Sequence, residues 1–190
     1  MRDDGSVDCG MDCGNHVIEG RYFRDRRLRG FFHMPKTTPA TTALRKLGIA
    51  FKLHTYVYDS GAEHIGLQAA EALDVEPNRV LKTLMVEVDG NPVCVVVPAD
   101  SEISMKKLAA ALDAKAAKMM QPSDAERITG YHVGGISPFG QRKKVPVAID
   151  QAALIHTTVF VNGGQRGLQI EIDPNDAAIA AGAVTHALTA

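Results

Sequence analysis

The chain reads Thr129-Gly130-Tyr131-His132-Val133-Gly134-Gly135-Ile136-Ser137-Pro138-Phe139-Gly140-Gln141 and then continues as Arg142-Lys143-Lys144, and no other segment is as informative. Four glycines and a proline within thirteen residues predict a loop, because glycine tolerates positive φ angles and leaves its backbone open to a ligand. Bare N–H groups in such a loop can bind an anion, and the three cations that follow add positive field. The alternative is a tight turn with solvated charges.

A second segment, Asn162-Gly163-Gly164-Gln165-Arg166-Gly167, again combines glycines with a cation, so two loops indicate one site for a phosphate-rich or carbonyl-bearing ligand. Together with Val80-Leu81-Lys82-Thr83-Leu84 upstream, these segments resemble the YbaK family of bacterial proteins, from about Met34 to the C-terminus. Members of that family are trans-acting editing factors that hydrolyse mischarged Cys-tRNA(Pro). Their fold is similar to the insertion domain of bacterial prolyl-tRNA synthetase. The GGISPFGQ run favours this branch over the related alanyl- and seryl-specific deacylases.

Helix and strand signals alternate along the chain without an internal repeat. Helices are expected over residues 37–47, 65–73, 104–112 and 122–130 and, rich in alanine, after Pro174. Strands are expected over residues 51–58, 80–88, 92–98, 145–150, 157–161 and 168–172, with a hairpin turn at Asp89-Gly90-Asn91. Short strands with interspersed helices predict an α+β fold with a mixed, strongly curved sheet. The resemblance sharpens this to a barrel-like sheet with peripheral helices.

Size and composition fit one globular domain without a membrane partner. The chain has 190 residues, 45% of them apolar, and a net charge of −1. No apolar run approaches the roughly 20 residues that span a bilayer. Because the net charge is close to zero, no DNA partner is expected and any tRNA contact must be local. Three cysteines without a disulfide framework fit the reducing cytoplasm.

Residues 1–33 differ from the remainder, which we take as the deacylase-like domain at 34–190. The stretch holds six arginines, no lysine and no sustained apolar periodicity. We expect a disordered extension or a mis-assigned start, since Met34 resembles a natural first residue. Cys9, Cys13 and His16 lack a fourth metal ligand, so a metal site is disfavoured. Cys94, in an apolar run, is expected to be a small core residue.

Lys82 is the strongest single candidate for an active-site residue. Period-two alternation places it on the more apolar face of its strand, where an ammonium is costly unless it reaches water, an anion or a ligand. From spacing alone, a lysine that snorkels to solvent is the favoured interpretation. The resemblance reverses this preference, because the matching lysine is the family's principal active-site residue. It would hold the carbonyl or the terminal-ribose end of the aminoacyl ester. Its face also carries Val80, Leu84, Val86 and Val88, and the other face carries Leu81, Thr83, Met85 and Glu87.

The resemblance implies further site residues. Gly134 would act with Lys82 in catalysis, and Gly134 and Gly135 match a loop whose backbone donors bind a developing oxyanion. Tyr56 matches a pocket tyrosine, although an amphipathic strand residue at a rim has the same pattern. Ser137 precedes a proline and lacks a GxSxG elbow, so a structural role outweighs that of a nucleophile. The substrate-binding set is Tyr56, Gly135, Ile136, Ser137, Asn162, Gly163, Gly164 and Gln169.

The second loop and the residue after it depart from the family pattern at three positions. Members often carry Ser-Gly-Gly-Lys-Arg-Gly-Leu followed by an acidic residue with a pocket role, whereas this chain has Asn162 and Gln165 in the loop and Gln169 after it. Gln169 can form hydrogen bonds but carries no charge. A role that needs a carboxylate is therefore in doubt, and the choice among Cys, Ala and Ser as the aminoacyl group stays open.

The sequence offers no set of protein nucleophile, base and metal. The histidines are scattered without an HExxH motif, so neither a metal nor a cofactor is expected. The family mechanism that fits uses the substrate's own cysteine thiol, which attacks the aminoacyl carbonyl and releases tRNA. The resemblance therefore implies an aminoacyl-tRNA deacylase, a hydrolase of ester bonds with a lyase-like first step. The alternative is a non-catalytic accessory protein that binds tRNA or a synthetase. A nucleotide-binding enzyme is disfavoured, because neither loop matches GxGxxG after a strand or GxxxxGK[ST].

The resemblance implies two partners, mischarged tRNA(Pro) and prolyl-tRNA synthetase, which would supply recognition of the acceptor stem. Seven cations are candidates for the tRNA-facing surface and could equally be ordinary solvated side chains. They are Lys106, Lys107, Lys115, Lys118, Arg142, Lys143 and Lys144.

Overall fold

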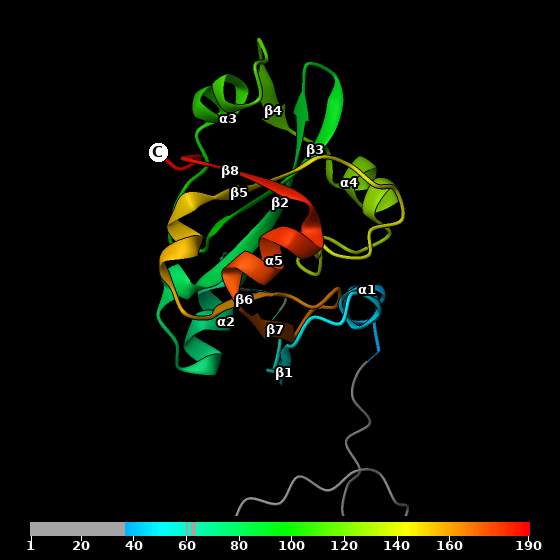
Figure 1. Cartoon of the computed structure of the whole chain (residues 1–190), viewed down its shortest axis with the longest axis vertical. Helices are drawn as coiled ribbons and strands as arrows, with labels where there is room; N and C mark the ends of the chain where they lie inside the picture. The colour runs from blue at the N-terminus through cyan, green and yellow to red at the C-terminus, as the bar shows by residue number, and fades with distance from the viewer. Residues whose placement is uncertain (1–36, 60, 62–63) are drawn as a thin grey trace, which may run out of the picture. The chain divides into compact units, whose positions relative to one another are not determined.

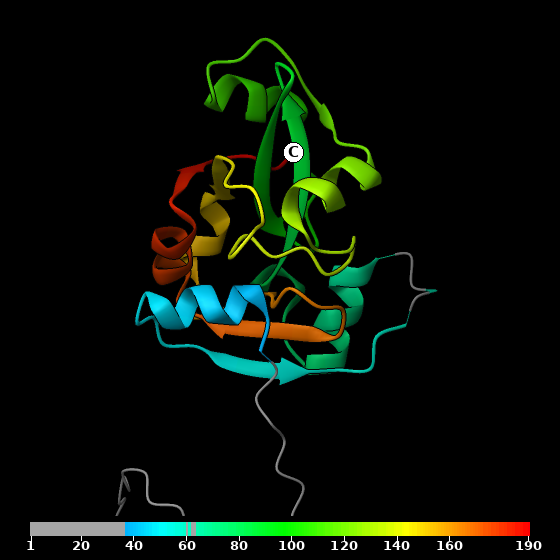
Figure 2. The ribbon, with the colours of Figure 1, turned by 90° about the vertical axis from the view of Figure 1, so that its right-hand side faces the viewer.

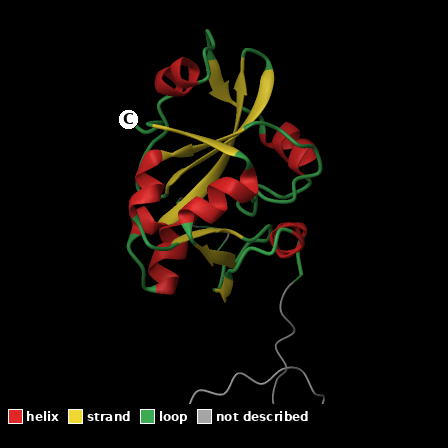
Figure 3. Cartoon of the chain, viewed as in Figure 1, coloured by secondary structure: helices red, strands yellow, loops and turns green. Residues whose placement is uncertain are grey.

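The computed structural model describes residues 37–59, 61 and 64–190 (Figures 1 and 3). Residues 1–33, with Cys9, Cys13 and His16, lie outside the described residues. The helices are α1 (Pro39–Lys46), α2 (Ile65–Leu73), η1 (Pro77–Arg79), α3 (Met105–Ala111), α4 (Pro122–Thr129), η2 (Gln151–Ile155) and α5 (Pro174–Ala181). The strands are β1 (Lys52–Thr55), β2 (Val80–Val88), β3 (Asn91–Pro98), β4 (Ala117–Met119), β5 (Val147–Asp150), β6 (Val159–Asn162), β7 (Leu168–Ile172) and β8 (Ala183–His186).

The strands form one mixed, curled sheet. Its order is β1-β7-β6-β2-β3-β5-β8, with β4 also paired to β2. The pairs β2–β6, β3–β5 and β5–β8 are parallel, and the others are antiparallel. In Figure 2, β1 and β7 lie side by side at the lower edge of the sheet, with α1 beside them. The predicted α+β fold with a strongly curved sheet and peripheral helices is confirmed.

One edge of β2 is divided between two partners. Its first residues, Val80 and Leu81, pair with β6, and its last three, from Val86 on, pair with β4. The other edge pairs with β3 along almost its whole length. Residues 82–85 therefore have a strand neighbour on one edge only, so the sheet opens there.

Local signals in the sequence explain most of the elements. Thr38, Ser104 and Asp173 accept hydrogen bonds from backbone amides at the starts of α1, α3 and α5, as N-caps do. The β2–β3 hairpin turns at Asp89 and Gly90, both with positive φ (46° and 81°), as a type I′ turn requires. These elements confirm the predicted helices and hairpin.

Several boundaries differ from the sequence prediction. The first strand ends at Thr55 rather than at residue 58, because its partner β7 begins only at Leu168, after Gly167 takes a φ of +76° that no strand adopts. β5 begins at Val147, two residues later than expected. β4 and β8 were not predicted, since neither shows an apolar alternation and both are defined by their partners β2 and β5.

The core lies on both faces of β2. Leu81 and Met85 belong to the largest buried cluster, whereas Val86 and Val88 belong to a second cluster under α3. A curled sheet with helices outside it therefore covers both faces of β2, the face of Lys82 that the sequence predicts to be more apolar and the opposite one. Cys94 is fully buried, as predicted. None of the helices in the part of the chain that is described is long and apolar enough to cross a membrane.

Candidate active site

A cavity of about 320 Å³ opens where β2 lacks a strand partner on one edge. Its volume is at the lower end of the roughly 300–1,000 Å³ of ligand pockets. Its wall is formed by β2, the start of α2, the residue after β3, the junction of β4 with α4, α4 itself, the loop after α4, and the strands β6 and β7. The lining residues are His64, Ile65, Gly66, Lys82, Thr83, Leu84, Met85, Ala99, Met119, Met120, Pro122, Ala125, Val133, Gly134, Ile136, Asn162 and Gln169.

Lys82 reaches across the cavity wall toward the end of β3. Its Nζ donates a hydrogen bond to the Ala99 carbonyl oxygen at 3.2 Å. Burial lowers the pKa of Lys82 from its ordinary value, while the carboxylates of Glu102 and Asp100 act in the opposite direction. An ammonium has three donors, so one bond to Ala99 leaves two for a ligand in the cavity.

The glycine loop after α4 is held by side chains from two other elements. The Val133 N–H donates to Glu126 Oε1 at 2.9 Å, and this hydrogen bond is the main reason why the pKa of Glu126 is lowered. Arg166 Nε donates to the Val133 carbonyl at 2.9 Å. The Arg166 guanidinium also lies over the Tyr58 ring, 5.4 Å from its centroid. The first and second glycine loops are thus joined at Val133.

Asn162 makes a second connection between the loops. Its Nδ2 donates to the Gly134 carbonyl at 3.0 Å, and its Oδ1 accepts from the Gly164 N–H at 2.9 Å. The Gly135 N–H donates to the His132 carbonyl at 2.8 Å and is therefore occupied within its own turn. Of the two glycines expected to supply backbone donors, Gly134 lines the cavity and Gly135 does not.

Three buried polar atoms at the site lack a hydrogen-bond partner among the described residues. They are Gln169 Oε1, Thr83 Oγ1 and the Tyr56 hydroxyl. Gln169 is only 3% exposed. Burial raises the pKa of Tyr56, and the neighbouring Gln169 side chain lowers it in part, although the two groups do not form a well-aligned hydrogen bond. Since buried polar groups are nearly always paired, Gln169 and Thr83, which line the cavity, indicate a place for a polar ligand.

The structure brings together half of the residues that the sequence singled out. Lys82, Gly134, Ile136, Asn162 and Gln169 line the cavity. The others support its walls: Ser137 is fully buried and its Oγ accepts from the Phe139 N–H at 3.4 Å, and the Gly163 carbonyl accepts from Thr38 Oγ1 at 2.6 Å. Gly164 has a φ of +86° and packs against the Tyr131 ring.

Several lining residues were missed from the sequence. The start of α2 and the methionines Met119 and Met120 carry no motif, and their helix or strand context gives no sign of a shared cavity. Thr83 could have been found from its place beside Lys82. Within the described ranges, no group of three or more His, Cys, Asp or Glu side chains could hold a metal ion.

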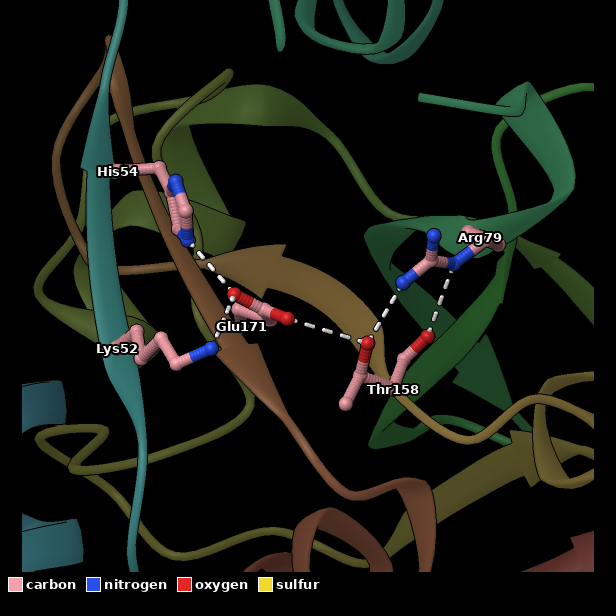
Figure 4. Close-up of polar contacts among 5 residues, drawn as sticks. All are labelled: Lys52, His54, Arg79, Thr158 and Glu171. Carbon is pink, nitrogen blue, oxygen red and sulfur yellow. Dashed lines mark hydrogen bonds and ion pairs between the residues drawn. The ribbon is translucent and has the colours of Figure 1, made fainter. Parts of the chain in front are cut away.

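A polar network fixes the edge strand that leads to Tyr56 (Figure 4). Glu171 Oε2 contacts His54 Nε2 at 2.9 Å and Lys52 Nζ at 3.6 Å, and its Oε1 accepts from Thr158 Oγ1 at 3.3 Å. Arg79 extends the network by donating to the same hydroxyl at 2.6 Å. The hydrogen bond from His54 is the main reason why the pKa of Glu171 is lowered. The network therefore ties β1 to β7 and to η1.

The candidate tRNA-facing cations fall in two places. Lys106 and Lys107 lie on α3, with Lys115 and Lys118 in or next to β4, and Met119, the next residue, lines the cavity. Lys118 forms an ion pair with Glu87 at 3.0 Å and is 72% exposed. Arg142–Lys144 follows the first glycine loop beside the end of α4, where the Arg142 N–H donates to the Thr129 carbonyl.

Comparison with known proteins agrees with this site. Residues 62–178 match the family described as the aminoacyl-tRNA editing domain, and the chain belongs to that family. The resemblance drawn from the three sequence segments is therefore confirmed.

Relatives that match the chain include proteins whose names describe a deacylase, a proline–tRNA ligase and a trans-editing enzyme. The chain is 34% identical over 144 residues, 73% of its length, to 87% of the "Putative Cys-tRNA(Pro)/Cys-tRNA(Cys) deacylase EbsC" of Enterococcus faecalis. It is 30% identical over 100 residues, 53% of its length, to 18% of a proline–tRNA ligase of Geobacillus kaustophilus. In fold it is similar to the crystal structure of "a putative trans-editing enzyme for prolyl tRNA synthetase", with a TM-score of 0.70, 19% identity and coverage of 82% of this chain and 99% of the other.

Proposed function

We propose that this protein is a trans-acting deacylase that hydrolyses mischarged Cys-tRNA(Pro). The observation that carries the proposal is the position of Lys82 on the wall of a cavity whose lining, among the described residues, includes residues with unpartnered polar atoms and no serine, cysteine or carboxylate. Membership in the editing-domain family and the likeness to EbsC support the substrate class. Editing is needed because a synthetase cannot reject an amino acid of similar size strongly enough by binding alone.

The substrate supplies the nucleophile in this mechanism. Its cysteine sulfur attacks the ester carbonyl carbon, a C–S bond forms, and the bond from that carbon to the ribose oxygen breaks. The thiol proton ends on the ribose oxygen, so tRNA leaves with a free hydroxyl, and water opens the resulting cyclic thioester to cysteine. Lys82 and the Gly134 backbone orient the ester and bind the oxygen that becomes negative, which are contributions of positioning and charge.

Single-turnover deacylation of Cys-, Ala- and Ser-tRNA(Pro) tests the proposal. We expect loss of the cysteinyl ester to be fastest and to slow by roughly 10²-fold or more in Lys82→Ala, because removal of one oxyanion donor has an effect of that size. Lys46→Ala is the matched control, since Lys46 is an exposed lysine on α1 that does not line the cavity. If Lys82→Ala deacylated Cys-tRNA(Pro) as fast as wild type, the assignment of Lys82 would be wrong. No turnover of any ester, even with prolyl-tRNA synthetase added, would instead favour an accessory binding protein.

The partners follow from the same proposal. A net charge of −1 gives little general attraction to tRNA, so we expect local phosphate contacts, with prolyl-tRNA synthetase recognising the acceptor stem. If Arg142, Lys143 and Lys144 contact phosphates, neutralising all three should flatten the salt dependence of tRNA binding. An unchanged salt slope would place the tRNA on another surface.

A further inference from the structure

The first turn of α2 lies between the two catalytic candidates. Ile65 and Gly66 line the cavity. A side-chain carbon added to Gly66 would lie 2.8 Å from Ala99 Cβ and 4.0 Å from Lys82 Cβ. A carbon added to Gly134 would lie 2.9 Å from Ile65 Cδ1. The start of the helix therefore touches the wall that carries Lys82 and the wall that carries Gly134.

Among the described residues, this helix start has no side-chain cap. The N-cap residue His64 makes no side-chain hydrogen bond to the first turn, and the first turn contains no acidic residue. The first helical hydrogen bond runs from the Gln68 N–H to the His64 carbonyl at 3.0 Å. The amides of Ile65, Gly66 and Leu67 precede it, and no residue in the described part of the chain accepts from them. Uncapped amides beside a cavity are available to a ligand.

Independent evidence for a ligand comes from the same cavity. Gln169, which is 3% exposed, and Thr83 are both lining residues, and their Oε1 and Oγ1 atoms have no hydrogen-bond partner among the described residues. Within the first glycine loop, the N–H groups of Val133 and Gly135 are already bonded to Glu126 and to the loop's own turn. The start of α2 thus offers backbone donors on the cavity wall that no described residue uses.

We infer that the amides of Ile65 and Gly66, together with the Lys82 ammonium, bind the ester carbonyl oxygen of the substrate as it gains negative charge. The inference rests on the proposed deacylase function. A helix N-terminus carries roughly half a positive charge, and donors fixed in a water-poor site stabilise a developing anion strongly. Glycine is required at position 66 because a side chain there would collide with Ala99 and move the helix start away from Lys82.

Removing one amide without removing the helix tests this inference. Proline lacks the N–H and is tolerated at the first helical position, and the backbone of His64 (φ −123°, ψ 86°) lies outside the helical region that a following proline disfavours. Ile65→Ala is the matched control, because it also loses the isoleucine side chain but keeps the amide. We expect Ile65→Pro to deacylate Cys-tRNA(Pro) with a kcat about 10²-fold below that of Ile65→Ala. KM and the thermal unfolding temperature should be similar in the two variants.

A pair of unreactive ligands separates this role from a structural one. A neutral 3′-cysteinylamino adenosine resembles the bound ester, and a phosphonate analogue resembles the anionic tetrahedral species. We expect wild type and Ile65→Ala to prefer the phosphonate, and Ile65→Pro to lose that preference by about tenfold or more while it binds the neutral amide normally. Equal kcat values and equal preferences in the two variants would overturn the inference.

A second substitution keeps the test decisive if Ile65→Pro does not fold. Gly66→Ala should reduce the same preference, and adding Ala99→Gly should restore it, because the second change removes the collision at 2.8 Å. Absence of rescue, or a Gly66→Ala variant with wild-type preference, would contradict the inference. If wild type deacylated no ester and bound neither analogue, the proposed function would fail, and this inference with it. Normal turnover with unaltered preferences would reject the inference alone.

Discussion

Replacing Asn162 with alanine should uncouple the two glycine loops. The Asn162 amide bonds to Gly134 at 3.0 Å and to Gly164 at 2.9 Å, and the residue is 7% exposed. Each hydrogen bond contributes about 1 kcal/mol net. Gly134 and Gly164 are only partly buried, so water can replace the lost partners and the full cost of two orphaned groups does not apply. We therefore expect Asn162→Ala to lower the free energy of unfolding by about 2 kcal/mol.

Urea unfolding followed by far-UV circular dichroism measures this change, since the chain has no tryptophan. Asn162→Asp separates the two bonds, because the carboxylate still accepts from Gly164 but cannot donate to Gly134. We expect the aspartate variant to lose at least as much stability as the alanine variant, because its buried carboxylate also faces the Gly134 carbonyl without a donor between them. It should deacylate Cys-tRNA(Pro) as poorly as the alanine variant, because both release Gly134. A loss of less than about 0.5 kcal/mol in Asn162→Ala, or wild-type kcat in Asn162→Asp, would refute the coupling.

Three further outcomes are expected. A hydrogen bond from His54 lowers the pKa of Glu171, so the ionised Glu171 stabilises the fold above the unfolded pKa of about 4.3, and this stabilisation is lost as pH falls through the lower folded pKa. Wild type should therefore exceed Glu171→Gln in unfolding free energy by about 1 kcal/mol at pH 6 and by little at pH 3. Gly140→Ala should cost at least about 2 kcal/mol in urea unfolding, because φ is +62° and the new carbon would collide with the Pro39 carbonyl, whereas Gly90→Ala, with positive φ but open space, should cost about 1 kcal/mol. Burial raises the pKa of the Cys94 thiol to about 12, so mass spectrometry should find it unmodified by iodoacetamide at pH 8 until urea unfolds the protein.

The sequence was most informative where a residue type has few conformations open to it. Asp89-Gly90 adopts the positive φ values that predicted the hairpin, and Gly130 ends α4 in the left-handed region. β4 and β8 could not be predicted in the same way. Ala117–Met119 has no strand pattern of its own and becomes a strand because β2 offers it an edge.

The candidate site also combines residues that the sequence alone singles out with residues that only the structure reveals. Lys82 and the two glycine loops stand out in the sequence, because a lysine within an apolar strand and a cluster of glycines are both costly without a reason. The unpartnered Gln169 amide and the uncapped start of α2 do not stand out, since an unmet hydrogen bond is visible only when the neighbours are in place.

By itself, therefore, the sequence determined the family, the α+β class and the residue types available for chemistry, because motif spacing, period-two alternation and turn residues are local properties of the chain. Tertiary structure alone decided that Ile65 and Gly66 meet Lys82 and that Asn162 joins the loops. It also decided that the Gly135 N–H donates a hydrogen bond within its own turn, to the His132 carbonyl. These contacts depend on where β2 passes from β6 to β4 and on how closely α2 packs there, and both are set by packing between segments far apart in the chain.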